Sequence, residues 1–165
     1  MNYCPNCGQK LQARDMDGVS RLACMEDKCG YVFWNNPVPV VAALVEHDGK
    51  YIIARNAQWP RGIFSLITGY LEEKETPEQA VVREVAEELG LEGKIKRFIG
   101  HYSFFEKNQL ILCYEIEAAG ALKLNHELLE MKQLSPEELS DYDFRPLYIT
   151  EKIIEDWRNI DERLG

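Results

Sequence analysis

The segment of residues 76–90 constrains the fold most, because it contains both ends of a helix and two distinct helical faces. Thr76, Pro77 and Gln79 have the pattern of a capping box with proline at the first helical position. Gly90 suits the left-handed residue that follows a helix. One face between these ends is apolar: Val81, Val82, Val85, Ala86 and Leu89. The pattern predicts a helix that is anchored in a hydrophobic core.

Three glutamates, Glu84, Glu87 and Glu88, occupy the adjacent face of this helix. Residues three and four positions apart are neighbours on a helix, so these carboxylates repel one another. Two interpretations follow. The glutamates form either an acidic face in solvent or a site where a divalent cation offsets the repulsion. Carboxylate oxygens are ligands that Mg²⁺ and Mn²⁺ favour, and the apolar face would hold them rigidly.

The composition fits one soluble globular domain with a small appendage. The chain has 165 residues, of which 45% are hydrophobic and 28% are charged. Its longest apolar run, residues 38–45, contains a proline and is too short to cross a bilayer. The chain opens without the pattern of a signal peptide, so we expect a cytoplasmic protein with no membrane partner. The net charge of −9 argues against a nucleic-acid-binding surface.

The cysteines predict a separate metal site near the N-terminus. Four of the five lie in the first 29 residues as two close pairs, Cys4 with Cys7 and Cys24 with Cys29. This spacing is typical of a structural zinc ribbon, in which each pair supplies two thiolates to one Zn²⁺ ion. Two disulfides are the alternative, which a cytosolic location disfavours. We therefore expect a zinc ribbon over residues 1–34, without the basic stripe of a nucleic-acid binder.

The rest of the chain, residues 35–165, mixes strands with helices. The regions expected to form strands are residues 38–55 (two strands joined by a turn at Asp48-Gly49), 64–70, 95–105 and 110–117. Ser135-Pro136-Glu137-Glu138 is a second capping box, and a last helix is expected from Thr150. Hairpins without regular βα alternation favour an α/β protein with a mixed sheet packed between helices.

The acidic helix belongs to a longer motif. Five residues separate Gly69 from Glu75, and seven more separate Glu75 from the stretch REVAEELGL, residues 83–91. The pattern resembles the Nudix box at every fixed position. Those positions are Gly69, Glu75, Arg83, Glu84, Val85, Glu87, Glu88, Gly90 and Leu91. With the cysteine pairs in front, the chain resembles the ribbon-bearing Nudix hydrolases, the NADH pyrophosphatase group among them.

The resemblance implies a Nudix fold, an α/β/α sandwich with a mixed sheet, preceded by the small zinc ribbon. It implies an enzyme, a pyrophosphohydrolase that uses Mg²⁺ or Mn²⁺. The expected substrate is a nucleoside diphosphate linked to a moiety X, such as ADP-ribose or NADH, cleaved to AMP plus X-phosphate. Residues 101–115 read HYSFFEKNQLILCYE, where NADH pyrophosphatases carry a tryptophan- and proline-rich stretch. We therefore expect the wider class of ADP-containing compounds.

The resemblance also assigns residues to roles. Glu84 and Glu88 are the main ligands of the catalytic metal, Glu87 assists, and the backbone carbonyl of Thr68 completes the set. Arg83 is expected to form a salt bridge with Glu75 that fixes the loop before the helix. Gly69 lets the chain turn close to the metals.

Many proteins of the resembling family use a glutamate beyond the motif as the base that activates water, and Glu127 and Glu130 are the candidates here. Glu130 is preferred because it lies four residues before Leu134, where the family tends to place this extra carboxylate. Six aromatic residues are candidates for stacking on the nucleotide base, and the sequence does not separate them from core residues: Trp59, Phe64, Tyr70, Tyr102, Phe104 and Phe105.

Two alternative functions stay open. One is a pyrophosphatase of oxidised nucleoside triphosphates, and the other is a non-catalytic nucleotide sensor. The resemblance also suggests a homodimer.

Overall fold

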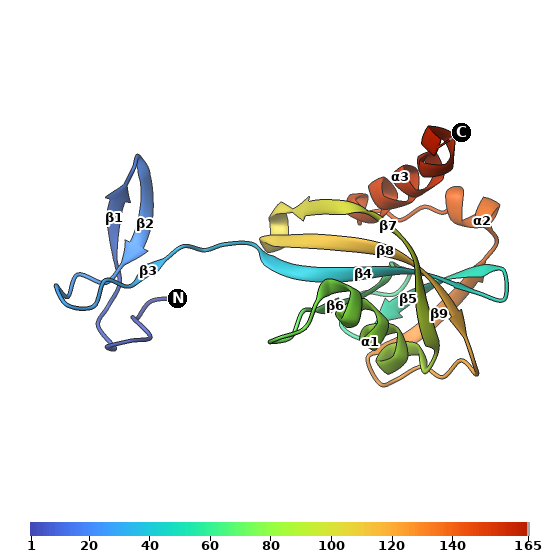
Figure 1. Ribbon diagram of the computed structural model, residues 1–165, viewed down its shortest axis with the longest axis horizontal. Helices are drawn as coiled ribbons and strands as arrows, with labels where there is room; N and C mark the ends of the chain where they lie inside the picture. The colour runs from blue at the N-terminus through green and yellow to red at the C-terminus, as the bar shows by residue number, and fades with distance from the viewer. Residues whose placement is uncertain (165) are drawn as a thin grey trace. The chain divides into compact units, whose positions relative to one another are not determined.

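The computed structural model describes residues 1–164, which form two compact units. The first comprises residues 1–36 and the second begins at Pro37 (Figure 1). The expected boundary, between residues 34 and 35, lies two residues earlier. Each unit has a core of its own. Within the described residues, no helix is both long and apolar enough to span a membrane.

The first unit is a small antiparallel sheet with few buried side chains. Its strands are β1 (Gln12–Met16), β2 (Val19–Ala23) and β3 (Val32–Phe33), and β2 lies in the middle. The centre of its core consists of Cys4, Leu11 and Cys24. Units of fewer than about 40 residues seldom bury enough apolar surface to fold alone and often need a bound metal. The position of two cysteines in this core indicates where such a metal would act.

The second unit is built on a mixed sheet of six strands. They are β4 (Val38–His47), β5 (Lys50–Asn56), β6 (Ile67–Tyr70), β7 (Glu92–Phe104), β8 (Gln109–Ala119) and β9 (Leu128–Leu134). The order is β7-β8-β4-β5-β9, and β6 also pairs with β4. The β4–β8 pair is parallel and every other pair is antiparallel. The expected mixed sheet is therefore confirmed.

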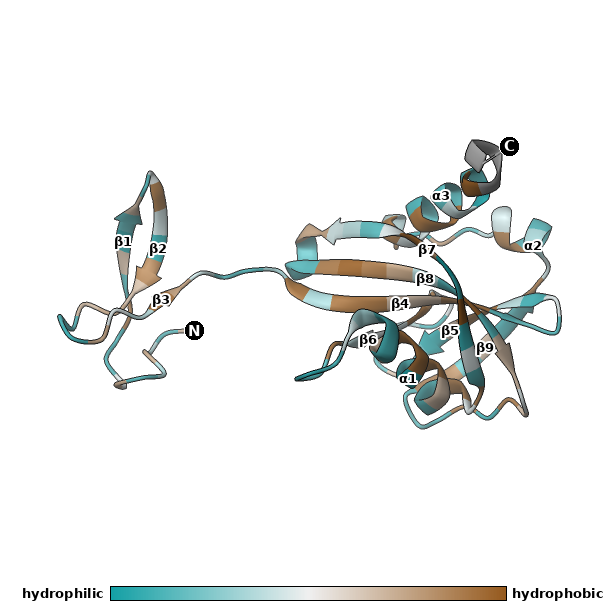
Figure 2. Ribbon diagram, in the orientation of Figure 1, coloured by the Kyte–Doolittle hydropathy of each residue, from teal (hydrophilic) through white to brown (hydrophobic). Residues whose placement is uncertain are grey.

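Helices cover both faces of this sheet. Figure 1 shows α1 (Pro77–Leu89) on one side and α3 (Tyr148–Leu164) on the other, with the short helix α2 (Pro136–Ser140) beside α3. Strand β4 divides its side chains between these sides, because successive residues of a strand point to opposite faces. The odd-numbered residues from Val41 to Val45 pack with α1, and the even-numbered ones from Val40 to Leu44 pack with α2 and α3. Figure 2 shows how apolar β4 is along its length. The expected α/β/α sandwich is confirmed.

The connections follow from local sequence. Asp48 and Gly49 both have positive φ angles, 51° and 74°, as a tight hairpin between twisted strands requires. Ser135 caps α2 through the expected capping box. The last helix begins at Tyr148, two residues before the expected Thr150. Strand β9 was not foreseen, and it bears on the site below.

Candidate active site

Both ends of α1 are fixed as the sequence predicts. The backbone N–H of Gln79 donates to the Thr76 hydroxyl (3.3 Å), and the Thr76 N–H donates to the Gln79 side chain (2.9 Å). Gly90 has a φ of 69°, and its N–H donates to the Ala86 carbonyl. Val81, Val85 and other apolar side chains of the helix are fully buried. The glutamates on the adjacent face are consequently carried by a rigid element.

Arg83 joins three of the motif's carboxylates. Its guanidinium donates to both oxygens of Glu75, at 2.8 and 2.9 Å. The same group donates to Glu84 at 2.7 Å and to Glu87 at 3.1 Å. It also donates to the backbone carbonyl of Tyr70, at 3.0 Å. The expected ion pair between Arg83 and Glu75 is thus present, and it ties the loop after β6 to the helix. Hydrogen bonds from Arg83 lower the pKa of Glu75.

Glu88 and Glu84 are acidic groups in an unfavourable environment. Only 4% of Glu88 is exposed. Burial, followed by repulsion from Glu84, Glu127 and Glu87, raises the pKa of Glu88 to about 8. Burial also raises the pKa of Glu84, although Arg83 opposes this. A divalent cation among these carboxylates would offset both causes, and all-oxygen donors suit Mg²⁺ and Mn²⁺.

Gly69 allows Glu84 to lie against the backbone of β6. A Cβ atom at position 69 would lie 1.9 Å from the carboxyl carbon of Glu84. Gly69 pairs with Val41 in the sheet, and the preceding residue, Thr68, pairs with Ala42. The absence of a side chain at position 69 therefore brings the Glu84 carboxylate beside the residue whose carbonyl is the expected further ligand.

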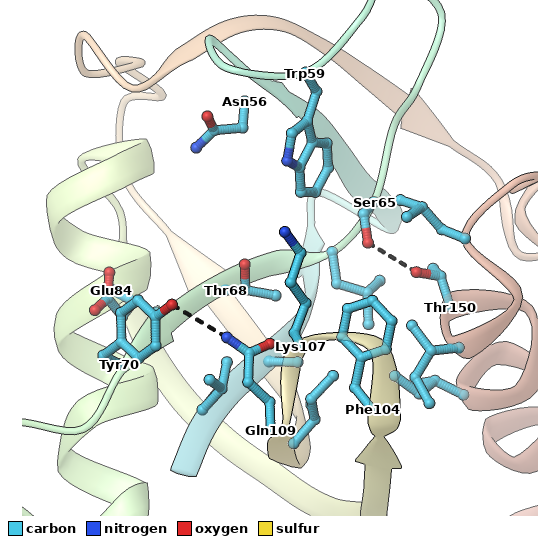
Figure 3. A pocket seen from close by; sticks show the side chains of 18 of the residues that line it. Asn56, Trp59, Ser65, Thr68, Tyr70, Glu84, Phe104, Lys107, Gln109 and Thr150 are labelled. Carbon is cyan, nitrogen blue, oxygen red and sulfur yellow. Dashed lines mark hydrogen bonds between the residues drawn. The ribbon is translucent and has the colours of Figure 1, made fainter. Parts of the chain in front are cut away.

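A cavity of about 460 Å³ opens at this point. Its acidic part includes Glu84 and Glu127, next to Thr68 and Gly69. Its other part is apolar and lies against α3. The apolar side chains that line the cavity include Val40, Ala42, Leu66, Phe104, Ile111, Leu147, Ile149 and Ile153. Figure 3 shows Glu84 on α1 at one side and Phe104 with the Ser65–Thr150 hydrogen bond (2.8 Å) at the other.

The structure separates the aromatic candidates that the sequence could not separate. Trp59, Tyr70 and Phe104 line the cavity. Phe64 and Tyr102 are buried in the core that contains α3. Phe105 is 86% exposed and is not among the lining residues. Three of the six candidates are therefore placed to contact a ligand.

The two candidate bases lie in different surroundings. Glu130 is on β9 directly opposite Arg55 on β5. Its carboxylate accepts hydrogen bonds from Arg55 at 2.6 and 3.2 Å. Glu127 precedes β9, lines the cavity together with Glu84, and is close enough to raise the pKa of both Glu84 and Glu88. The structure thus brings Glu127, and not Glu130, to the acidic part of the cavity.

The four N-terminal cysteines converge. Their sulfur atoms all lie within 4.8 Å of one another, and among the described residues this is the one group of three or more histidine, cysteine or acidic side chains that converges so closely. All of them are free thiols, as is Cys113. Burial opposes ionisation of Cys4, but hydrogen bonds from the backbone amides of Asn6 and Cys7 and from the side chains of Cys29 and Cys7 together lower the pKa of Cys4 to about 7. Four converging sulfurs fit a tetrahedral zinc ion.

Solved structures share this architecture. A NUDIX hydrolase from Nitrosomonas europaea matches with a TM-score of 0.80 and 25% identity, covering 99% of this chain and 93% of that one. The E. coli ORF135 protein matches with a TM-score of 0.63 and 28% identity, covering 78% of this chain and 93% of that one. The fold and the acidic helix beside the cavity thus define the class of Nudix proteins.

Residues 36–153 match the family model described as the NUDIX domain, so the chain belongs to the NUDIX family. The resemblance seen in the sequence is confirmed, as is the expected class of protein, a Nudix hydrolase. The NAD-capped RNA hydrolase NudC of Pseudomonas aeruginosa is 32% identical over 115 residues, which are 70% of this chain and 40% of that protein. The mitochondrial NAD(P)H pyrophosphatase NUDT13 of Mus musculus is 29% identical over 132 residues, covering 79% and 36%. The chain spans two fifths or less of the length of these relatives.

Proposed function

We propose that this protein is a metal-dependent pyrophosphohydrolase that cleaves a nucleoside diphosphate linked to a moiety X. The products are AMP and X-phosphate. The observation that carries the proposal is the cavity. It has Glu84 of an intact Nudix box at one part and an apolar, aromatic surface at the other. Such a cavity suits a molecule with a phosphate group at one end and a flat base at the other.

We assign the catalytic metal to the helix glutamates. Glu84 and Glu88 would be the main ligands of Mg²⁺ or Mn²⁺, Glu87 would assist, and the Thr68 carbonyl would complete the set. When bound, such a cation lowers the pKa of a coordinated water and neutralises charge on the bridging oxygen. The protein's own contribution is to hold the metal-binding carboxylates in place. The caps and buried face of α1 hold the carboxylates, and Arg83 keeps Glu75 and its loop against them.

We further propose Glu127 as the base that takes a proton from the attacking water. Its place in the cavity with Glu84 supports this role. Glu130, the preferred candidate from sequence, is engaged by Arg55. Arg55 also donates to the carbonyl of Trp59 at 3.2 Å. We therefore assign Glu130 to holding Arg55, and through it the loop that carries Trp59.

Zinc is the second metal of the proposal. One Zn²⁺ ion, held by Cys4, Cys7, Cys24 and Cys29, would stabilise the first unit. The converging free thiols and the small apolar core of that unit support it. A cytoplasmic location stays a prediction. A homodimer stays a prediction, and analytical ultracentrifugation would test it.

The names of the relatives support an adenylate-containing substrate, because one acts on NAD-capped RNA and another on NAD(P)H. The test is a substrate panel with Mg²⁺ or Mn²⁺ and chromatographic identification of products. ADP-ribose, NADH, FAD and dinucleoside polyphosphates are compared with dGTP and 8-oxo-dGTP. We expect AMP from at least one of the first group. Turnover of the triphosphates alone, with release of pyrophosphate, would show that the substrate class is wrong. No turnover with either metal would favour a nucleotide sensor.

A further inference from the structure

Lys107 is a cationic side chain that the Nudix box does not include. It ends the 3₁₀ helix η1 (Phe105–Lys107), which connects β7 to β8. Figure 3 shows its amino group pointing into the cavity, toward Trp59 on the opposite wall. Among the described residues that line the cavity, Lys107 is the one lysine, arginine or histidine. Glu84 and Glu127 are the acidic ones.

The two arginines near the site, Arg83 and Arg55, form ion pairs with carboxylates, whereas Lys107 does not. Arg83 donates to three glutamates, and Arg55 donates to Glu130 and to a backbone carbonyl. No described residue forms a hydrogen bond or an ion pair with the Lys107 amino group. Its three N–H donors are thus available to a ligand.

The position of Lys107 indicates which part of a ligand it meets. In Figure 3 its side chain lies between the group formed by Glu84 and Tyr70 and the group formed by Phe104 and Thr150. On the first side, Gln109 donates to the Tyr70 hydroxyl at 3.1 Å, so these two side chains are engaged with each other. In a nucleotide that places its base in the apolar part and its reacting anhydride at the acidic part, the 5′-phosphate is the half of the anhydride that lies nearer the base.

We infer that Lys107 binds a non-bridging oxygen of the phosphate that remains on the nucleotide product. The inference rests on the proposed function, because it takes a nucleotide as the ligand. A cation at this position would also reduce the electrostatic repulsion between the cavity and an anionic ligand. The protein has a net charge of −9 and two glutamates in the cavity, and both disfavour an anionic ligand. Lys107 therefore makes the cavity select a nucleotide over the corresponding nucleoside.

The test is equilibrium binding of four nucleoside monophosphates, AMP, GMP, CMP and UMP, and of their nucleosides to the full chain. Isothermal titration calorimetry is run without added divalent ions, so that neither turnover nor a catalytic metal contributes. The measured quantity is the affinity of each monophosphate divided by that of its nucleoside. Because a charge-assisted hydrogen bond is lost, Lys107→Met should lower this ratio about tenfold for the base that binds best. Lys107→Arg should retain most of it.

Two controls make the result specific. Lys50→Met removes an exposed lysine at the start of β5, away from the cavity, and should leave the ratio at its wild-type value. Affinity for the nucleoside alone should be the same in Lys107→Met and in the wild type, which shows that the cavity is intact. A wild-type ratio in Lys107→Met would overturn the inference. So would an equal fall in Lys50→Met.

Kinetics separate this inference from the proposed function. With a substrate found in the panel, Lys107→Met should raise KM about tenfold and leave kcat within about twofold, because the contact is present before and during reaction. A fall in kcat with unchanged KM would contradict a binding role. If the wild type turns over no substrate, the proposed function fails, while the ratio of nucleotide to nucleoside affinity still decides the role of Lys107.

Discussion

Gly69 and Glu84 illustrate how single residues set the geometry of this site. The backbone at Gly69 lies where a methyl group would overlap the Glu84 carboxylate, so the glycine determines where that carboxylate sits. The sequence marks Gly69 as a fixed position of the motif, and the resemblance implies only that it lets the chain turn close to the metals. The reason is close approach and not a positive φ angle, since Gly69 is not among the positive-φ glycines. The spacing of the motif predicts a glycine at position 69, but only the structure shows that this glycine lies against Glu84.

Gly69→Ala should displace the Glu84 carboxylate and lower kcat about a hundredfold, since misplacing a catalytic group by an ångström has effects of that size. The melting temperature should change little, because the end of a glutamate side chain can move. Gly93→Ala is the matched control. Its added methyl group would meet Ile116 and Val85 under the same helix, so it should lower stability more than turnover. Full activity in Gly69→Ala would contradict the assignment of Glu84.

Glu88→Gln should retain the fold and lose nearly all turnover, because it removes a buried charge assigned to the metal and leaves the apolar face of α1 intact. It should also change how stability depends on pH. Without divalent ions, the pKa of Glu88 is about 8 in the folded protein, compared with an ordinary value of 4.5. The folded state therefore holds a proton that the unfolded state has lost, and stability falls as pH rises from about 4.5 to about 8.

Melting temperatures between pH 5 and pH 8.5, measured without divalent ions, test this. The wild type should become less stable along the series, and Glu88→Gln should show a shallower decline. Added Mg²⁺ should stabilise the wild type most at the upper end. Equal slopes in the two proteins would show that Glu88 is not the group responsible, and wild-type kcat in folded Glu88→Gln would reject the metal assignment.

Among the helices and strands, the sequence predicts best the features that depend on residues close together in the chain. Both ends of α1 and the β4–β5 hairpin follow from capping and turn residues, which act within a few positions of one another. Strand β9 was missed because its sequence, LLEMKQL, is mostly exposed and lacks the apolar alternation of a strand with one buried face. The parallel pairing of β4 with β8 could not be predicted from the sequence either, since it joins segments some seventy residues apart. The surroundings of Glu130 were also beyond prediction, because only the register of β9 shows that Glu130 lies opposite Arg55. Its role as the base stays a prediction.

The two glutamates beyond the motif should respond differently to the same substitution. Glu127→Gln should lower kcat by about 10²- to 10⁴-fold and remove the limb of the pH profile that reports the base. Glu130→Gln should mainly raise KM, because Arg55 loses its partner and the loop carrying Trp59 loosens. Steady-state kinetics across pH distinguishes the two. The reverse outcome would return Glu130 to the role first expected from the sequence.

The whole chain joins two units with separate cores, and a different metal is proposed for each. Cysteine spacing alone predicts the first unit, because thiolate pairs in a small sequence have few other uses. The cavity could not be predicted, since it is lined by segments from β4 to α3 that only the tertiary fold brings together. Which residues make its apolar part is therefore a property of the fold, whereas Glu84 in its acidic part belongs to one short motif.

Elemental analysis of the purified protein after mild EDTA treatment should find about one zinc per chain, because four thiolates hold zinc far more tightly than carboxylates hold magnesium. Cys24→Ser should lose this zinc and make residues 1–36 susceptible to proteolysis. The second unit should keep its melting transition, since its core contains no residue of the first. A protein without zinc whose four thiols are freely titratable would contradict the ribbon.

The division of β4 between two cores limits how this protein can evolve. Val40 and Ala42 form part of the cavity wall, while Val41 and Ala43 support the helix that carries the glutamates. Inserting or deleting one residue in this strand would exchange the two sets, so that neither the wall nor the support would survive. Insertions and deletions that alter ligand preference are therefore expected in the connecting segments, near Trp59 and Lys107. The strand itself is free to change only by substitution, one face at a time.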